Sequence, residues 1–254
     1  MVRPAANLSW LFGEHELMDR FRAAKAAGFD AVEVLFPYDC PAQDMRDQLI
    51  WNDLHLILIN CPPPNATGGP QGFAAIPGLE ERFRRDFDRT MRFAKVLKPD
   101  HIHIMAGAPD AAADPALCRA TFVENLRWAA ARAPGQSLTI EPINRHDMPG
   151  YFLADFDLAA AILDEVAAPN LALQFDAYHA QRITGDVLGT WARHGHRAVH
   201  VQVAGYPGRH EPAGGEIDYP AFFARLDADG YAGWVSGEYK PRTETVAGLG
   251  WTSA

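Results

Sequence analysis

Helical and strand patterns alternate along the whole chain, and this alternation limits the possible folds more than any other feature of the sequence. Leu17, Phe21 and Ala24 recur at helical spacing, Gly28 stops the pattern, and residues 30–36 read as a strand. The 254 residues contain eight strand candidates, which leaves about 32 residues for each unit, near the size of a βα repeat. The strands are predicted at residues 6–10, 30–36, 54–60, 101–106, 137–141, 171–176, 198–203 and 233–238.

Helices are predicted between these strands. The clearest one carries Leu79, Phe83, Phe87 and Met91 four residues apart, and Pro99 lies where the helix would have to continue. Other helices are predicted from Asp114-Pro115, an N-cap with a first-turn proline, to Pro134, at about residues 155–167, near residues 184–194 and at residues 219–228.

A (β/α)8 TIM barrel is the fold that this arrangement predicts, as a single domain over residues 1–254 with a short C-terminal tail. Only about 16 residues follow the last predicted strand, which is too few for a long eighth helix with its loop. An open doubly wound sheet is the alternative. Such sheets usually carry a Gly-rich phosphate turn after an early strand, and neither GxGxxG nor GxxxxGKS/T occurs in this sequence.

The composition argues against nucleic acid and membranes as partners and favours a reducing compartment. With 23 Lys and Arg against 32 Asp and Glu, the formal net charge is −9, which disfavours binding to nucleic acid. The longest apolar run, Leu158 to Leu163, is six residues, far below the 20 or so that a membrane-spanning helix needs. Cys40, Cys61 and Cys118 form no CxxC pair, so we expect a protein of the reducing cytoplasm that does not bind a membrane.

Side chains that carry oxygen end four consecutive predicted strands. They are Glu141, Asp176, Gln202 and Glu238. Because the C-terminal ends of barrel strands meet at one face, we expect the four side chains to converge. Three carboxylates packed together need a counter-cation, and hard oxygen ligands suit Mg²⁺ or Mn²⁺ better than Zn²⁺. The alternative interpretation is that these residues cap helices or simply end strands.

The same four residues suggest a reaction. A cation held by carboxylates can bind the adjacent oxygens of an α-hydroxy carbonyl compound and stabilise an enediolate while a proton moves between carbons. Glu141 and Glu238 come from the outer two of the four strands, so they are the natural base and acid. A carboxylate that binds the metal is kept ionised, however, so one of the two must hold it loosely.

A series of short segments spread over the chain forms a specific pattern, and with them the chain resembles the hydroxypyruvate isomerase family, a branch of the metal-dependent sugar isomerase and epimerase barrels. The similarity runs through most of the chain. Its segments are residues 72–78 (GFAAIPG), 141–144 (EPIN), 149–153 (PGYFL), 175–179 (FDAYH), 200–204 (HVQVA), 207–212 (PGRHEP), 215–217 (GEI), 238–241 (EYKP) and 248–251 (GLGW).

The resemblance implies that Glu141, Asp176, Gln202 and Glu238 ligate the metal and that Glu141 and Glu238 form the proton donor and acceptor pair. It also implies interconversion of hydroxypyruvate with tartronate semialdehyde, or of 2-oxo- with 3-oxo-tetronates. Two departures leave the substrate open. The family loop typically carries an acidic and a basic residue where this chain has Gly68-Gly69-Pro70-Gln71, so the role of residues 65–72 is undetermined, and Gly205 replaces the usual Asp.

Three further residues are candidates for substrate binding. His179 follows Asp176 by three residues and is expected at the same mouth, to hydrogen-bond a substrate hydroxyl group or else a neighbouring carbonyl. Arg209 lies on a Gly-rich loop, where it binds a substrate carboxylate or else is a solvated surface residue. His103 begins the fourth strand with His101, and a structural or substrate-contacting role is favoured over a metal pair.

The leading hypothesis is therefore a metal-dependent isomerase that acts on a small hydroxy-keto acid. A sugar epimerase on the same barrel is one alternative. A metal-dependent hydrolase related to endonucleases is another, although it would need more His ligands and a basic face. A third is a binding protein for sugar acids without catalytic activity. The expected partner is a small molecule, and a homo-oligomer remains open.

Overall fold

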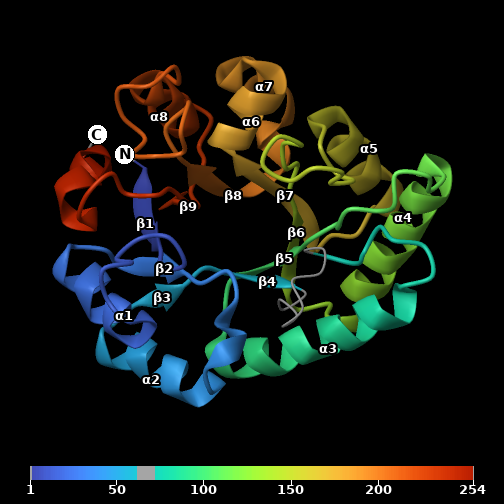
Figure 1. Cartoon of the computed structure of the whole chain (residues 1–254), viewed down its shortest axis with the longest axis horizontal. Coiled ribbons are helices and arrows are strands. Elements are labelled where there is room, and N and C mark those ends of the chain that lie inside the picture. The colour runs from blue at the N-terminus through green and yellow to red at the C-terminus, as the bar shows by residue number, and fades with distance from the viewer. Residues whose placement is uncertain (1, 62–71, 254) are drawn as a thin grey trace.

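Parallel strands form a ring, and helices surround it in the computed structural model, which describes residues 2–61 and 72–253 (Figure 1). Neighbouring strands pair in the order β3-β2-β1-β9-β8-β7-β6-β5-β4. The strands are β1 (Arg3–Asn7), β2 (Ala31–Glu33), β3 (His55–Leu56), β4 (Leu58–Cys61), β5 (His101–Ile104), β6 (Ser137–Ile140), β7 (Leu171–Asp176), β8 (Ala198–Val203) and β9 (Trp234–Gly237).

The ring closes through β3 and β4, which are two parts of the single strand predicted at residues 54–60. Only Ile57 separates them; β3 pairs with β2 and β4 pairs with β5. The backbone nitrogen of Val34 donates to the carbonyl of Leu58 at 3.2 Å, and that of Asn60 donates to Leu35 at 2.8 Å. The chain after β2 is thus bonded to β4 as well, so the nine strand segments make eight staves. The predicted (β/α)8 barrel is confirmed.

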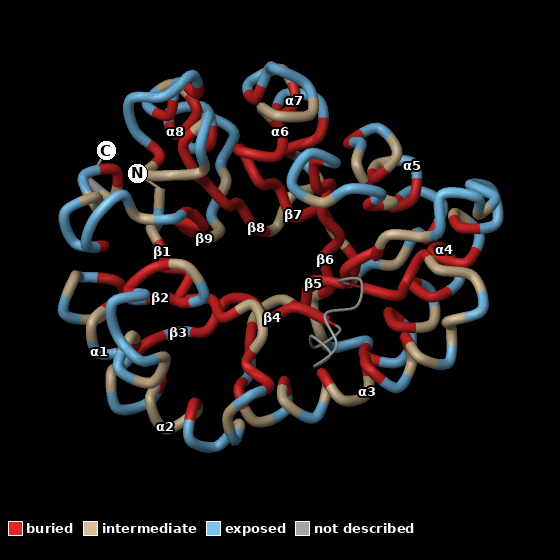
Figure 2. Tube along the Cα trace, in the orientation of Figure 1, coloured by how far each residue is buried: buried red, intermediate tan, exposed pale blue. Residues whose placement is uncertain are grey.

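The helices lie outside the ring with their buried sides toward it (Figure 2). The predicted N-cap Asp114 accepts a hydrogen bond from the backbone of Ala116 at 2.9 Å, and Asp155, which was not predicted as a cap, accepts one from Leu158 at 2.6 Å. No helix in the described residues is long and apolar enough to cross a membrane. The helices are α1 (Leu17–Ala26), η1 (Pro37–Asp39), α2 (Ala42–Trp51), α3 (Glu80–Leu97), α4 (Pro115–Arg132), α5 (Phe156–Val166), α6 (Ala177–Thr184), α7 (Val187–His194), η2 (Gly195–Arg197), α8 (Tyr219–Ala228) and η3 (Thr245–Ser253).

Two helices were not expected from the sequence, and one strand lies elsewhere. Helix α2 buries only Met45 and Leu49 and so lacks a strong apolar stripe. Helix α6 has eight residues and begins directly where β7 ends, so that no loop separates strand from helix. The first strand is residues 3–7 rather than 6–10, because residues 3–6 pair with β9 and the chain turns directly after Asn7.

The C-terminal tail takes the place of the long α-helix that would follow the last strand, as the short segment after that strand predicts. It forms η3, whose Trp251 is buried and donates a hydrogen bond from Nε1 to the hydroxyl of Tyr239 at 3.1 Å. Thr245 accepts a bond from the backbone of Phe12 at 2.6 Å, which ties the tail to the loop after β1. The tail therefore covers the junction between the first and last staves.

Strand alternation decides which residues reach the interior of the ring. In β7, Phe175 points outward and packs against Phe156, Trp191 and Phe222 of the surrounding helices. Its neighbours in the strand, Gln174 and Asp176, therefore point inward. The same alternation turns polar side chains of β2, β6, β8 and β9 into the ring, where they form the candidate site.

Candidate active site

A cavity of about 970 Å³ opens among the segments that follow the C-terminal ends of the strands. This is the end at which barrel enzymes carry their active sites. Five of the seven residues proposed from the sequence line the cavity: His103, Glu141, His179, Arg209 and Glu238. The other two are buried: Asp176 contacts Arg209, and Gln202 is hydrogen-bonded to Gln174, which also lines the cavity.

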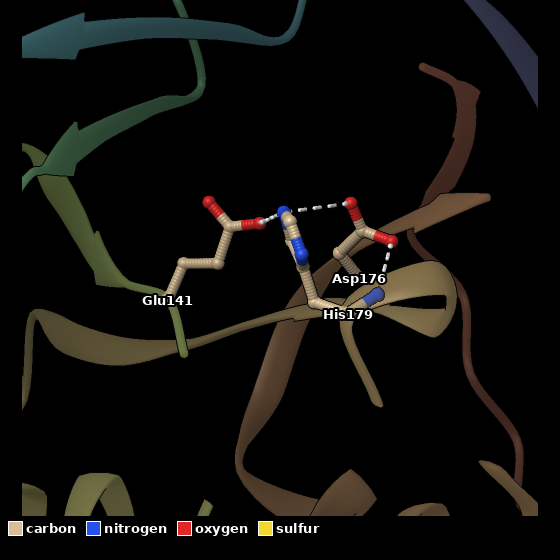
Figure 3. Close-up of side chains that lie close together, drawn as sticks. All are labelled: Glu141, Asp176 and His179. Carbon is tan, nitrogen blue, oxygen red and sulfur yellow. Dashed lines mark hydrogen bonds and ion pairs between the residues drawn. The ribbon is translucent and has the colours of Figure 1, made fainter. Parts of the chain in front are cut away.

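Glu141, Asp176 and His179 lie close together, and one potential ligand atom from each is within 4.8 Å of the others (Figure 3). His179 Nε2 is 3.7 Å from Asp176 Oδ2 and 3.9 Å from Glu141 Oε1. The sequence placed His179 at the mouth as a contact for substrate. Its position between two carboxylates places it next to any ion that they hold, which the sequence did not indicate.

Asp176 combines the two interpretations that the sequence left open. Its Oδ1 caps α6, accepting hydrogen bonds from the backbone nitrogens of Tyr178 at 2.7 Å and His179 at 3.3 Å. Its Oδ2 faces Arg209 and His179. The capping hydrogen bonds fix the orientation of the carboxylate, so that Oδ2 stays directed at Arg209 and His179.

Arg209 is not a solvated surface residue. Its Nη2 lies 2.6 Å from Glu238 Oε1 and 3.5 Å from Asp176 Oδ2, and its guanidinium stacks on the rings of Trp10 and Tyr178. The backbone at Arg209 is left-handed, with φ of 54°, a conformation that costs energy for a side chain of this size. The strained loop thus holds a largely covered guanidinium against two carboxylates.

A chain of side-chain amides joins Gln202 to Glu141. Gln174 Nε2 donates to Gln202 Oε1 at 2.7 Å and to Glu141 Oε2 at 3.1 Å, while its Oε1 accepts from Thr139 at 3.1 Å. The amide nitrogen of Gln202 donates to Glu33 at 2.7 Å. Because an ionised carboxylate only accepts, Glu33 orients the Gln202 amide with its oxygen on the Glu141 side. The amide oxygen of Gln202 therefore points toward the cluster, and the side-chain amide of Gln174 links it to Glu141.

Glu33 was missed by the sequence analysis although it is central to the ring. It is fully buried at the end of β2 and lies 2.6 Å from Asn7 Nδ2 and 2.7 Å from His200 Nε2, in addition to its bond with Gln202. The available signal was a carboxylate between two apolar residues, Val32 and Val34, within the predicted strand. Its partners on β8 are 167 and 169 residues away in the sequence, so periodicity could not have revealed them.

Replacing Glu33 by Ala is expected to lower the free energy of unfolding by about 3 kcal/mol, because three buried donors would lose their acceptor. Glu33→Gln should cost less, since it keeps the volume and one acceptor oxygen. Urea unfolding followed by circular dichroism measures both. Glu216→Ala, at an exposed position, is the control and should change stability by less than about 0.5 kcal/mol. An equally small effect at Glu33 would contradict the assigned bonds.

The carboxylates are short of positive charge. Burial, together with the charges of Asp176 and Glu238, raises the pKa of Glu141 well above its usual range. Burial also raises the pKa of Glu238 to about 8, even though Arg209 opposes the shift. Burial lowers the pKa of His103 to about 3 and that of His179 to about 4, so both imidazoles are neutral and supply no charge. One guanidinium does not balance the three carboxylates.

A divalent cation fits this donor set. The available atoms are carboxylate oxygens and the amide oxygen of Gln202, and oxygen-rich sets of this kind suit hard cations. His179 Nε2 lies beside them and carries the proton of the neutral imidazole, because Nδ1 accepts from the amide nitrogen of Asn144. Among the described residues, Glu141, Asp176 and His179 form the one group of acidic, His or Cys side chains close enough to hold an ion. The ligand roles of Glu141, Asp176, Gln202 and Glu238 remain predictions.

His103 contacts the cluster from the opposite direction. It lies in β5, and its Nδ1 is 3.5 Å from Glu141 Oε2.

Of the two loops that depart from the family pattern, Gly68-Gly69-Pro70-Gln71 lies outside the described residues. At Gly205 the reason for the departure is visible, because a Cβ there would collide with the carbonyl oxygen of Glu211. The backbone of Gly205 instead donates to His210 at 2.7 Å.

The chain is similar over its full length to known TIM-barrel proteins. A family model described as a xylose isomerase-like TIM barrel matches residues 21–254. A 2-oxo-tetronate isomerase of Cupriavidus necator is 49% identical, over 99% of this chain and 97% of its own length. A hydroxypyruvate isomerase of Escherichia coli is 40% identical, over 99% of this chain and 98% of its own length. A solved structure from Brucella melitensis, titled AP endonuclease, family 2, is 42% identical, covers 100% of this chain and 98% of its own, and has a TM-score of 0.96.

The similarity at full length to proteins named as isomerases agrees with the family that the sequence motifs indicated. The chain belongs to the xylose isomerase-like TIM barrel family, within its hydroxypyruvate isomerase group, and it is an isomerase.

Proposed function

We propose that this protein interconverts a small hydroxy-keto acid and its isomer with a shifted carbonyl group, through an enediolate and with a divalent metal, Mg²⁺ or Mn²⁺. The substrates in view are hydroxypyruvate, which would give tartronate semialdehyde, and 2-oxo-tetronate, which would give 3-oxo-tetronate. The observation that carries the proposal is the pair Glu141 and Glu238, which line one cavity from the ends of β6 and β9, with Asp176 and Gln202 from the two strands between them.

Glu141 and Glu238 perform the proton transfer in this proposal. One carboxylate removes the C–H proton from the carbon that bears the hydroxyl group, and the electron pair of that bond forms the carbon–carbon double bond of the enediolate. Protonation of the neighbouring carbon by the other carboxylic acid, with transfer of the hydroxyl proton between the two oxygens, moves the carbonyl group by one position. A bound cation would stabilise the negative charge that develops on the two substrate oxygens.

Arg209 and His179 position the substrate. The guanidinium of Arg209 is held at the cavity wall and has donors left for a carboxylate, because its Nε has no partner among the described residues. His179 is neutral, and its Nδ1 is 2.7 Å from the amide nitrogen of Asn144, which leaves Nε2 facing the carboxylates and the cavity. It can donate a hydrogen bond to a substrate oxygen without adding charge.

Replacing Arg209 by Gln is expected to lower kcat/KM for the acid substrate by about 10- to 100-fold, mainly through a higher KM, because a charge-assisted hydrogen bond to the substrate carboxylate is lost. Arg209→Lys should recover part of the loss, since it keeps the charge without the planar fork. Steady-state kinetics separate the two parameters. Arg193→Gln, on the exposed side of α7, is the matched control. An unchanged KM would remove Arg209 from carboxylate binding.

The function itself is tested with a panel of three- and four-carbon oxo acids, assayed with Mg²⁺ or Mn²⁺ in deuterated water. We expect isomerisation of at least one acid, with solvent deuterium appearing on carbon only when metal is present. Isomerisation without deuterium incorporation would indicate a hydride shift. The name of the Brucella structure raises cleavage of nucleic acid as another possibility, but the net charge of −9 and the single potential metal cluster among the described residues favour the isomerase.

A further inference from the structure

Two neighbouring polar side chains inside the ring have hydrogen-bonding atoms without partners among the described residues. Asn60 of β4 and His103 of β5 are register partners on adjacent strands, and only 4% and 1% of their surfaces are exposed. The Oδ1 of Asn60 and both ring nitrogens of His103 are unpartnered. The amide nitrogen of Asn60 makes only a weak contact, 3.9 Å from the sulfur of Met105. Buried polar groups are normally hydrogen-bonded, so this pair is built for a group that binds there.

The pair lies on the wall of the active cavity, beside the reacting groups. Asn60 and His103 line the same cavity as Glu141, Glu238 and Arg209. His103 Nδ1 is 3.5 Å from Glu141 Oε2, so a ligand bound to the pair is adjacent to a carboxylate of the proposed proton transfer. Figure 1 shows β4 and β5 across the ring from β8 and β9, and Arg209 and Lys240 follow those two strands.

The chemistry of the pair distinguishes the two ends of the substrate. The side of the cavity that follows β8 and β9 carries cations and suits the carboxylate. Asn60 and His103 carry no charge, and each offers both a donor and an acceptor, which is what a hydroxyl group needs. With the carboxylate at Arg209 and the reacting carbons between Glu141 and Glu238, the next carbon of a longer substrate extends toward Asn60. A three-carbon acid has no group at this position.

We propose that Asn60 and His103 form a subsite for the terminal hydroxyl group of a four-carbon hydroxy-keto acid, which makes the protein prefer a 2-oxo-tetronate to hydroxypyruvate. This inference rests on the proposed function, because it uses that orientation of the substrate. Asn60 is the specificity-determining residue of the subsite, and His103 supports it from the neighbouring strand.

A binding experiment tests the subsite without requiring turnover. The full-length protein, loaded with Mg²⁺, is titrated calorimetrically with 2,3,4-trihydroxybutanoate and with 2,3-dihydroxybutanoate, which differ only in the terminal hydroxyl group. The wild-type protein should bind the trihydroxy acid about tenfold more tightly, and Asn60→Leu should bind both acids equally. Met148→Leu, an apolar change elsewhere in the same cavity, should keep the tenfold difference. Asn60→Ala replaces Asn60→Leu if the larger side chain impairs folding.

Turnover provides the second measurement. The ratio of kcat/KM for 2-oxo-tetronate to that for hydroxypyruvate should fall about tenfold in Asn60→Leu, mostly through KM. An equal loss for both acids, or a trihydroxy acid preference that survives the replacement, would overturn the subsite. If no acid were isomerised in deuterated water, the proposed function would fail, while the two binding affinities would still decide whether Asn60 recognises the hydroxyl group.

Discussion

Replacing Glu238 by Gln is expected to lower kcat by about a thousandfold while the barrel stays folded. Gln has the same shape and keeps an oxygen that can accept the hydrogen bond from Arg209, now 2.6 Å from Glu238. It cannot take up or release a proton, and it offers a weaker ligand to a cation. Turnover of the oxo acid and deuterium incorporation from solvent should therefore disappear together.

The matched control is Glu216→Gln, an exposed position on the loop that follows β8, where activity should stay within about twofold of the wild-type value. Thermal unfolding of both variants shows whether the fold is intact. A Glu238→Gln protein that retained a tenth of the wild-type kcat would exclude Glu238 from the proton transfer. Exchange that survived without isomerisation would instead place the other carboxylate, Glu141, at the first proton removal.

The position of the site was predictable because it follows from topology. A barrel brings the C-terminal ends of all its strands to one face, so a polar residue at the end of each strand can be assigned to that face before any contact is known. This argument located Glu141, Asp176 and Glu238 in one region, where Asp176 and Glu238 contact Arg209 and Glu141 lies beside His179. The same reasoning predicts the location of any site residue that lies at the C-terminal end of a barrel strand.

The contacts inside the ring were not predictable in the same way. Glu33 reaches Gln202 across the barrel, and this pairing depends on the stagger of the strands rather than on local sequence. The shift of register between β7 and β8 at Leu173 and Gln174 is a further detail that alternation alone does not supply. Arg209 shows the same limit, because a Gly-rich loop suggested mobility, whereas ion pairs and two aromatic rings hold it.

Removal of divalent metal by a chelator is expected to lower activity by about a thousandfold or more, with recovery on addition of Mg²⁺ or Mn²⁺. The physical reason is the charge of the cluster. Asp176, Glu141 and Glu238 are all buried, and among the described residues one guanidinium, that of Arg209, forms ion pairs with two of them, Asp176 and Glu238. Without the cation, the charge that forms on the substrate oxygens would add to that of the carboxylates. Activity unchanged after dialysis against chelator would contradict the metal requirement.

The same cluster predicts the pH dependence of metal uptake. Burial raises the pKa of Glu238 to about 8 in the protein without metal, so at pH 7 this carboxyl group is mostly protonated. A cation that binds its oxygens must displace the proton, as it must at Glu141, whose pKa is also raised, and the apparent affinity for Mn²⁺ should therefore rise as the pH increases from 6. Titration calorimetry in buffers of different ionisation enthalpy measures the released protons directly. In Glu238→Gln the proton release from this site should vanish, whereas an unchanged release would assign the titrating group elsewhere in the cluster.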